Sequence, residues 1–219
     1  MNEIMFILLV AITSYLAGSF PTSIIMGKLL RSIDIRNYGS GNPGGANTFR
    51  VLGWKAGIAV LVIDVFKGFA ATHWFSKIAL NQIPSTYLVP IQILAGFSAV
   101  LGHSFTIFAG FRGGKGIATG AGILISLFPL IIPFCGLIFF SILVLTGYVS
   151  LSSIGASISF PILTTTLYLM GKPVDSTFLV FSFFIPFFIL FTHRNNIKRL
   201  LSGTEIRSVK LMIFKPKEK

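Results

Sequence analysis

Three short segments combine basic side chains with glycines, whose backbone N–H groups can face a ligand. They are GSGNPGGANTFR (residues 39–50), GHSFTIFAGFRGGKGIATGAG (residues 102–122) and HRNNIKRLLSGTE (residues 193–205). Glycine-rich turns can direct several backbone N–H groups toward one point, and such a concave surface binds anions. Lysine adds a point charge there, and arginine adds a fork of donors that suits phosphate oxygens. The three segments therefore predict a site for anionic, phosphate-bearing ligands.

The first segment offers open amides together with polar side chains. Ser40, Asn42, Asn47 and Thr48 lie among its glycines, and Arg50 can add a charge-assisted contact to a phosphate. The alternative interpretation is a loop that happens to be rich in glycine, because glycine, asparagine and proline are also common turn formers.

The second segment does not form a nucleotide-binding P-loop. Ala109 stands where that motif requires its first glycine, and Gly116 follows Lys115 where it requires serine or threonine. Lys115 can still neutralise a phosphate. His103 is a candidate base or hydrogen-bond donor, although a histidine near a helix end is often structural.

Polar residues elsewhere complete the list of candidates. His193, Asn196 and Glu205 of the third segment are not needed to anchor a helix end, whereas Arg194, Lys198 and Arg199 would be expected there as simple anchors. Asp64 and Lys67 are three residues apart, so they share a helix face and can neutralise each other. The pair either serves function or fixes helix packing. Ser150 can bind a phosphate or cap a helix.

These segments lie in a chain whose composition is that of an integral membrane protein. Of its residues 53% are hydrophobic and 11% are charged, and the mean hydropathy is +0.85, whereas soluble proteins carry about 25% charged residues. A membrane span needs about 20 apolar residues. Pro129 and Pro133 divide one stretch that is too long for a single helix. We expect a single all-α membrane domain with seven transmembrane helices, at 4–26, 54–76, 86–108, 117–128, 131–147, 151–170 and 176–192.

The basic residues predict how the chain is oriented in the membrane. Fifteen of the 18 lysines and arginines lie in the loops after the predicted first and third helices or in the tail 193–219. Cytoplasmic segments carry such an excess, so we expect the N-terminus outside and the C-terminus in the cytoplasm. All three polar segments then lie on the cytoplasmic face. The same rule accounts for the net charge of +12 without nucleic acid as a partner.

Taken together, SGNPGGANTFR, DVFKG, GHSFTIFAGFRGGKGIATGAG and HRNNIKRLLSGTE resemble the bacterial acyl-phosphate:glycerol-3-phosphate acyltransferase family of the PlsY type. The resemblance covers nearly the whole chain and keeps the family's order of motifs. Differences are mild: Gly45 and Ala46 replace alanine and threonine, Thr106 replaces a proline, and Arg112 replaces a lysine. None of them removes a titratable residue.

The resemblance implies transfer of a fatty acyl group from acyl phosphate to the 1-hydroxyl of sn-glycerol 3-phosphate, in the bacterial inner membrane, without a metal or cofactor. A soluble enzyme that produces acyl phosphate is a candidate partner for the basic tail. The implied catalytic residues are His193, Asn196, Lys115 and Ser40. The implied substrate-binding residues are Gly41, Asn42, Gly44, Asn47, Arg50, Lys67, His103, Gly113, Gly114, Ser150 and Glu205.

Two questions stay open on the sequence alone. The base that takes the proton of the glycerol hydroxyl is either His193 or the phosphate of the donor itself. A small transporter of a phosphorylated or lipid anion is the alternative function, favoured by Asp64, Lys67 and the proline-broken stretch 117–147. The chain shows no internal repeat and concentrates its polar motifs at one face, and both features favour the enzyme.

Overall fold

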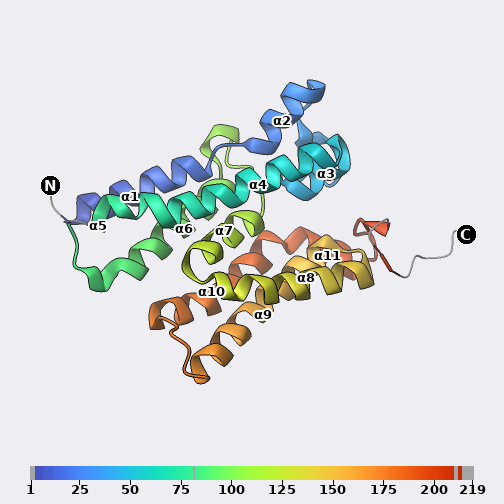
Figure 1. The fold of residues 1–219 in the computed structure, drawn as a ribbon. Coiled ribbons are helices and arrows are strands. Elements are labelled where there is room, and N and C mark those ends of the chain that lie inside the picture. Colours follow the sequence, from blue (N-terminus) through green and yellow to red (C-terminus); the bar gives the residue numbers. More distant parts are fainter. Residues whose placement is uncertain (1–2, 81, 210–211, 214–219) are drawn as a thin grey trace, which may run out of the picture. The chain divides into compact units, whose positions relative to one another are not determined.

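The computed structural model describes residues 3–80, 82–209 and 212–213, and each regular element in these ranges is a helix (Figure 1). The chain divides into two compact units, Met1–Pro129 (unit 1) and Leu130–Lys219 (unit 2). The structure thus confirms the all-helical class that the composition predicted.

Unit 1 is built on two pairs of packed helices. Helix α1 (Glu3–Gly18) packs against α6 (Leu88–Ser104), and α4 (Trp54–Ala70) packs against α7 (Ile117–Leu127). Glycines allow both close approaches. A Cβ atom at Gly18 would overlap the carbonyl oxygen of Ala99, and one at Gly122 would overlap that of Val65. Small residues at such crossings are the usual means of packing helices in a bilayer, where van der Waals contact is a main attraction.

The predicted first helix, 4–26, is divided in the structure. Helix α1 ends at Gly18, and α2 (Thr22–Arg31) begins after a short break at residues 19–21. Pro21 accounts for the break, because its ring removes one backbone donor and clashes with the preceding turn of a helix. In the break, the carbonyl oxygens of Ser19 and Phe20 accept hydrogen bonds from the side chains of Thr106 and Lys67.

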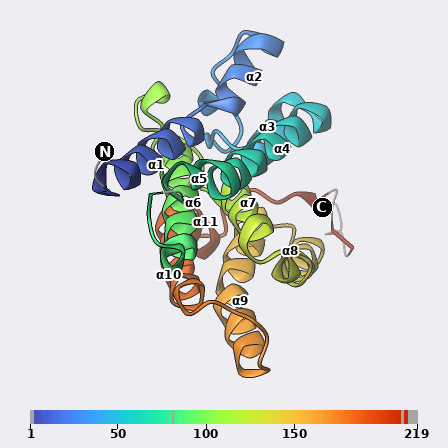
Figure 2. The same cartoon turned by 60° about the vertical axis from the view of Figure 1, so that its left-hand side comes forward.

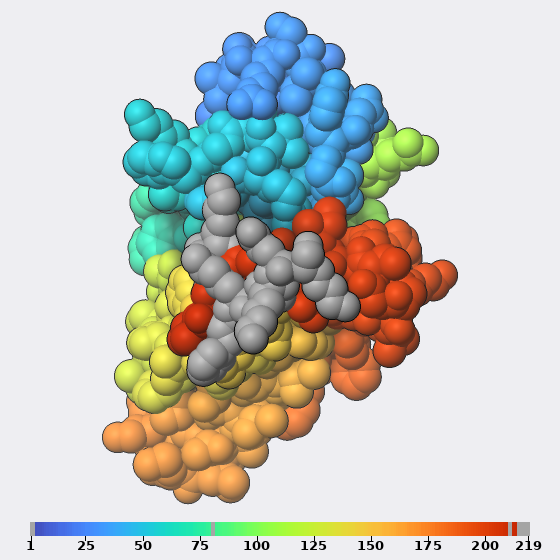
Figure 3. All heavy atoms as spheres, turned by 90° about the vertical axis from the view of Figure 1, so that its right-hand side faces the viewer, coloured from blue at the N-terminus to red at the C-terminus, as the bar shows by residue number. Residues whose placement is uncertain are grey.

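Short elements connect the main helices of unit 1. Helix α3 packs against both α2 and α4, and Figure 3 shows this part of the surface of unit 1 in blue and cyan. The short elements are η1 (Ile35–Asn37), α3 (Gly45–Leu52), η2 (Ala71–Phe75), α5 (Lys77–Leu80), η3 (Ser85–Tyr87) and η4 (Ile107–Ala109).

The described part of unit 2 contains three long helices, of which α9 packs against both of the others (Figure 2). A turn, η5 (Pro129–Ile131), follows α7 in the sequence and leads into them. His193 lies between the last long helix and a short helix that begins at Arg194 and runs in a new direction. The helices of unit 2 are α8 (Ile132–Thr146), α9 (Val149–Leu169), α10 (Ser176–Thr192) and α11 (Arg194–Leu201).

Five helical stretches in the described residues are long and apolar enough to cross a membrane, and there are six if the bent pair α10–α11 counts as one span. The five are Glu3–Arg31, Trp54–Ala79, Ser85–Ala109, Pro129–Thr146 and Val149–Leu169, and α7 is a shorter apolar helix. Large apolar side chains are exposed along these stretches, such as Phe66, Phe140 and Leu169. Exposed apolar surface of this extent fits a lipid environment. The chain is therefore a multi-pass membrane protein.

Candidate active site

The loop between α2 and α3 is organised by the side chain of Asn47. Its Oδ1 accepts a hydrogen bond from the backbone N–H of Ser40 at 2.8 Å, and its Nδ2 donates to the carbonyl oxygens of Tyr38 at 3.0 Å and Ile35 at 3.3 Å. Asn47 is fully buried. Its amide therefore holds the loop together, and its three hydrogen bonds indicate a structural role.

The other candidates of the first segment lie around that loop. Ser40 and Asn42 are partly exposed, Gly41 is exposed, and Gly44 is the residue before the first turn of α3. Arg50 lies in the last turn of α3 with an exposed side chain. The segment thus presents polar groups on the surface of unit 1, with Asn47 beneath them.

Arg36 connects this loop to the second segment, a role that sequence reasoning missed. Its Nε and Nη2 atoms donate to both carboxylate oxygens of Asp34, and its Nη1 donates to the carbonyl oxygen of Ala109 at 2.9 Å. The hydrogen bond from Arg36 lowers the pKa of Asp34 below its ordinary value. The signal available in the sequence was an acid and a base two residues apart at a helix end, but the partner at Ala109 is 73 residues away.

The second segment folds back onto the end of α6. The backbone N–H of Gly114 donates to the carbonyl oxygen of His103 at 3.0 Å, and that of Gly113 donates to Ser104 at 3.1 Å. We call residues 112–116 the glycine loop. It carries Arg112, which is exposed, and Lys115, which is half-buried, and Gly116 precedes the first turn of α7.

Asp64 lies at the centre of a buried network beside this loop. Its Oδ1 accepts from Lys67 Nζ at 2.7 Å and from Thr22 Oγ1 at 3.1 Å, and it lies 3.7 Å from His103 Nδ1. The structure thus confirms that Asp64 and Lys67 pair. The Lys67 ammonium also donates to the carbonyl oxygen of Phe20, at 2.5 Å, in the break between α1 and α2.

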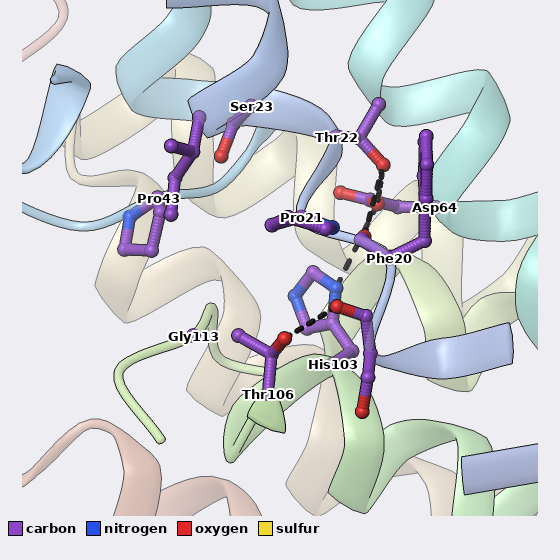
Figure 4. Close-up of a pocket in the computed structure, with 11 residues that line it drawn as sticks. Phe20, Pro21, Thr22, Ser23, Pro43, Asp64, His103, Thr106 and Gly113 are labelled. Atoms are coloured by element: carbon purple, nitrogen blue, oxygen red, sulfur yellow. Dashed lines mark hydrogen bonds and ion pairs between the residues drawn. The ribbon is translucent and has the colours of Figure 1, made fainter. Parts of the chain in front are cut away.

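A small pocket opens at this junction (Figure 4). Asp64 and His103 contribute to its wall, together with Thr22, Pro43 and Gly113. The pocket therefore touches the α1–α2 break, the first segment and the glycine loop. Thr106 also lines it and donates to the carbonyl oxygen of Ser19, so its hydroxyl supports the break.

The third segment forms a second polar cluster, in unit 2, around Glu205. Its Oε1 accepts from Ser150 Oγ at 2.8 Å and from Asn196 Nδ2 at 2.6 Å, and its Oε2 accepts from Arg199 Nε at 2.6 Å. Burial raises the pKa of Glu205, but the hydrogen bonds from Asn196, Ser150 and Arg199 outweigh it, and the pKa lies below its ordinary value. Arg199, interpreted from the sequence as a helix anchor, is thus part of the cluster.

His193 ends α10 in the same unit and is buried. Its Nδ1 lies 2.9 Å from the carbonyl oxygen of Ile189. Because a carbonyl oxygen only accepts hydrogen bonds, this contact assigns the ring proton to Nδ1 and the lone pair of the neutral imidazole to Nε2. The second nitrogen is therefore the one that can take a proton.

The sequence candidates thus fall into two groups. Unit 1 holds the candidates of the first two segments and Lys67, and unit 2 holds Ser150, His193, Asn196 and Glu205. Of the basic tail 193–219, Lys210, Lys215, Lys217 and Lys219 lie outside the described residues. Within each unit, the structure brings together residues that are dozens of positions apart in the chain.

The multi-pass fold and its polar motifs are those of a known family of membrane enzymes. The sequence model of glycerol-3-phosphate acyltransferase matches residues 8–203, and the chain belongs to this family. Its relatives include glycerol-3-phosphate acyltransferases of Chlorobaculum parvum, 45% identical, and Pelodictyon phaeoclathratiforme, 41% identical. These alignments cover 89% of this chain and 93% of the first relative, and 92% of this chain and 96% of the second.

The fold is also similar to solved structures of PlsY, which is described as an integral membrane glycerol 3-phosphate acyltransferase. Its glycerol 3-phosphate form is 36% identical with a TM-score of 0.76, and its lysophosphatidic acid form is 35% identical with a TM-score of 0.74. Both comparisons cover 92% of this chain and 94% of the other.

Proposed function

We propose that this protein transfers a fatty acyl group from acyl phosphate to the 1-hydroxyl of sn-glycerol 3-phosphate. The new ester bond forms lysophosphatidic acid, the acyl–phosphate bond breaks, and inorganic phosphate leaves with the electrons of that bond. The hydroxyl proton passes to a base. Membership of the glycerol-3-phosphate acyltransferase family is the observation that carries the proposal.

The chemistry of the two clusters supports this reaction. Acyl phosphate is already activated, so the protein must mainly position two anions and stabilise charge that develops on oxygen. In unit 1, Arg50 and Lys115 are suited to phosphate groups, with Ser40 and Asn42 as further polar contacts. The N–H groups of Gly41, Gly44, Gly113 and Gly114 already donate to backbone carbonyl groups, so these glycines contribute by letting a phosphate approach the backbone closely and not as donors. Lys67 of α4 is paired with Asp64 and donates to the carbonyl oxygen of Phe20, so it supports the break between α1 and α2.

Unit 2 has a polar cluster of its own around Glu205. Glu205 fixes the orientation of the Asn196 amide and the Ser150 hydroxyl, which lie beside it at hydrogen-bond distance. Both side chains can still contact a substrate through their other polar atoms or lone pairs. We assign His193 and Asn196 to catalysis and Ser150 and Glu205 to binding and positioning.

His193 is the candidate general base. In the neutral imidazole, the contact with Ile189 assigns the lone pair to Nε2, and a general base needs such a lone pair. The phosphate of the donor is the competing proton acceptor. If His193 is the base, removal of its imidazole should abolish most of the activity. If the donor phosphate accepts the proton, the same removal should cost little activity.

Seven membrane segments are proposed for the chain, with α7 as the short one. The positive-inside rule places the N-terminus outside and the C-terminus in the cytoplasm. The polar motifs then face the cytoplasm, where glycerol 3-phosphate is dissolved. The basic tail is a candidate contact for the soluble enzyme that makes acyl phosphate.

A comparison of acyl donors tests the reaction. Purified protein in detergent is supplied with glycerol 3-phosphate and either acyl phosphate or acyl-CoA of the same chain length. We expect lysophosphatidic acid with acyl phosphate. Turnover with acyl-CoA alone would overturn the donor, and no turnover with either would favour a transporter of phosphorylated or lipid anions.

A further inference from the structure

We propose that Asp64 is a positioning residue for the glycine loop and acts on it through His103. The inference rests on the proposed function, because it assigns a role in binding one of the two phosphate-bearing substrates. It goes beyond the ion pair with Lys67, which by itself would only neutralise a charge inside the membrane segment.

The first step is the contact between Asp64 and His103. The carboxylate oxygen Oδ1 lies 3.7 Å from His103 Nδ1, and 2% of Asp64 and 8% of His103 are exposed. The same oxygen is fixed by Lys67 and Thr22, which belong to α4 and α2. The carboxylate is therefore held in place, and the histidine ring at the end of α6 lies against a fixed negative charge.

The second step is the contact between His103 and the glycine loop. The loop is hydrogen-bonded to the backbone of the same residue through Gly114 N–H. The ring of His103 packs directly on Gly114: a Cβ atom at that position would overlap Nε2. Gly114 is buried, so the ring and the loop share a tight interior contact. A rotation of the ring would therefore displace the loop.

These contacts connect Asp64 through His103 to the glycine loop, which contains the basic residues Arg112 and Lys115. Nδ1 of His103 faces the carboxylate, and Nε2 is the atom that a Cβ at Gly114 would overlap. Gly113 lines the same pocket as Asp64 and His103 (Figure 4). Lys115 follows Gly114 directly, so the placement of its backbone depends on the contact with His103.

A structural role and a positioning role predict different results for a neutral replacement of the ion pair. Asp64→Asn alone would leave the Lys67 charge buried and is expected to destabilise the protein. The double variant Asp64→Asn/Lys67→Met removes both charges and keeps the size of each side chain. If Asp64 only neutralised Lys67, the double variant would lose no contact that reaches the glycine loop, because the other hydrogen bond of Lys67 goes to Phe20 in the α1–α2 break.

The experiment measures the KM of both substrates and kcat for the wild type, the double variant and His103→Gln. His103→Gln leaves the ion pair intact, so it remains informative if the double variant does not fold. We expect each variant to raise the KM of one and the same substrate about tenfold, with kcat changed less than threefold. Combining all three substitutions should raise that KM less than twofold further, because both changes act on the same contact.

Three results would overturn the inference. They are wild-type KM values for both substrates in His103→Gln, wild-type KM values in a folded double variant, and multiplicative effects in the triple variant. The proposed function has its own readout, because the wild type must turn over acyl phosphate in the same assay. An inactive wild type would overturn both proposals, whereas an active wild type with unaffected variants would overturn this one alone.

Discussion

Asn196 donates a hydrogen bond of 2.6 Å to Glu205, nine residues later, across the end of α11. The same carboxylate oxygen accepts from Ser150, which belongs to α9. One carboxylate thus connects two helices of unit 2 with the segment that follows α11. Asn196 is buried, so the carboxylate of Glu205 gives its amide an acceptor inside the protein.

Replacement of Glu205 by glutamine should weaken unit 2 in a pH-dependent manner. The pKa of Glu205 lies below its ordinary value of about 4.5, so its charge stabilises the fold above that pH, and this contribution is lost as the pH falls through the native pKa. We expect the thermal midpoint of Glu205→Gln to lie a few degrees below that of the wild type at pH 7, and the two midpoints to converge as the pH falls through the native pKa of Glu205. A difference that persists unchanged in acid would contradict this assignment.

Replacement of His193 by alanine tests the general base. A positioned base contributes about 10²–10⁴-fold to a rate, so kcat should fall by at least about 100-fold, and the dependence of kcat on pH should lose one ionisation. His73→Ala is the matched control, because His73 is a histidine in unit 1 that stacks on Phe69. A loss of only a few-fold in His193→Ala would instead assign proton transfer to the phosphate of the donor.

Asn47→Ala should destabilise the loop of the first segment. The substitution leaves the backbone N–H of Ser40 without this acceptor, and the carbonyl groups of Ile35 and Tyr38 each lose one of two donors. A buried polar group without its partner costs about 1–3 kcal/mol, so the midpoint of thermal unfolding should fall by several degrees. Asn37→Ala, at an exposed position nearby, is the control. Equal stability of the two variants would show that the Asn47 amide does not organise the loop.

Two glycines of α7 offer a matched test of the α4–α7 crossing. A Cβ atom at Gly122 would overlap backbone atoms of α4, whereas one at Gly120 meets nothing within 4 Å. Gly122→Ala should lower stability by about 1–3 kcal/mol through overpacking. Gly120→Ala should be neutral or stabilising by up to about 1 kcal/mol, because alanine is the better helix former. Similar stabilities for the two variants would contradict the close approach.

Local patterns in the sequence predicted part of the site. The spacing of three residues between Asp64 and Lys67 was sufficient to predict their pairing, because residues at this spacing share a helix face. Composition and length likewise predicted a helical membrane protein. The break at residues 19–21 was missed, although Pro21 marked it, because the apolar residues continue on both sides.

Contacts between distant segments could not be predicted. The sequence did not reveal that Ser150 meets Glu205, 55 residues away, or that Arg36 reaches Ala109. Asn47 illustrates the limit within one motif: its amide was a candidate for ligand binding, but the structure engages it in three backbone hydrogen bonds. The tertiary structure decides which polar groups of a motif form hydrogen bonds within the protein, and the motif alone does not show this.

The stoichiometry of products tests the central claim most directly. Purified protein is incubated with acyl phosphate and radiolabelled glycerol 3-phosphate, and lysophosphatidic acid and inorganic phosphate are measured together over the initial rate. The proposed reaction predicts one molecule of each product per turnover, with phosphate release dependent on glycerol 3-phosphate. Phosphate release that continues without glycerol 3-phosphate and yields no lysophosphatidic acid would contradict acyl transfer.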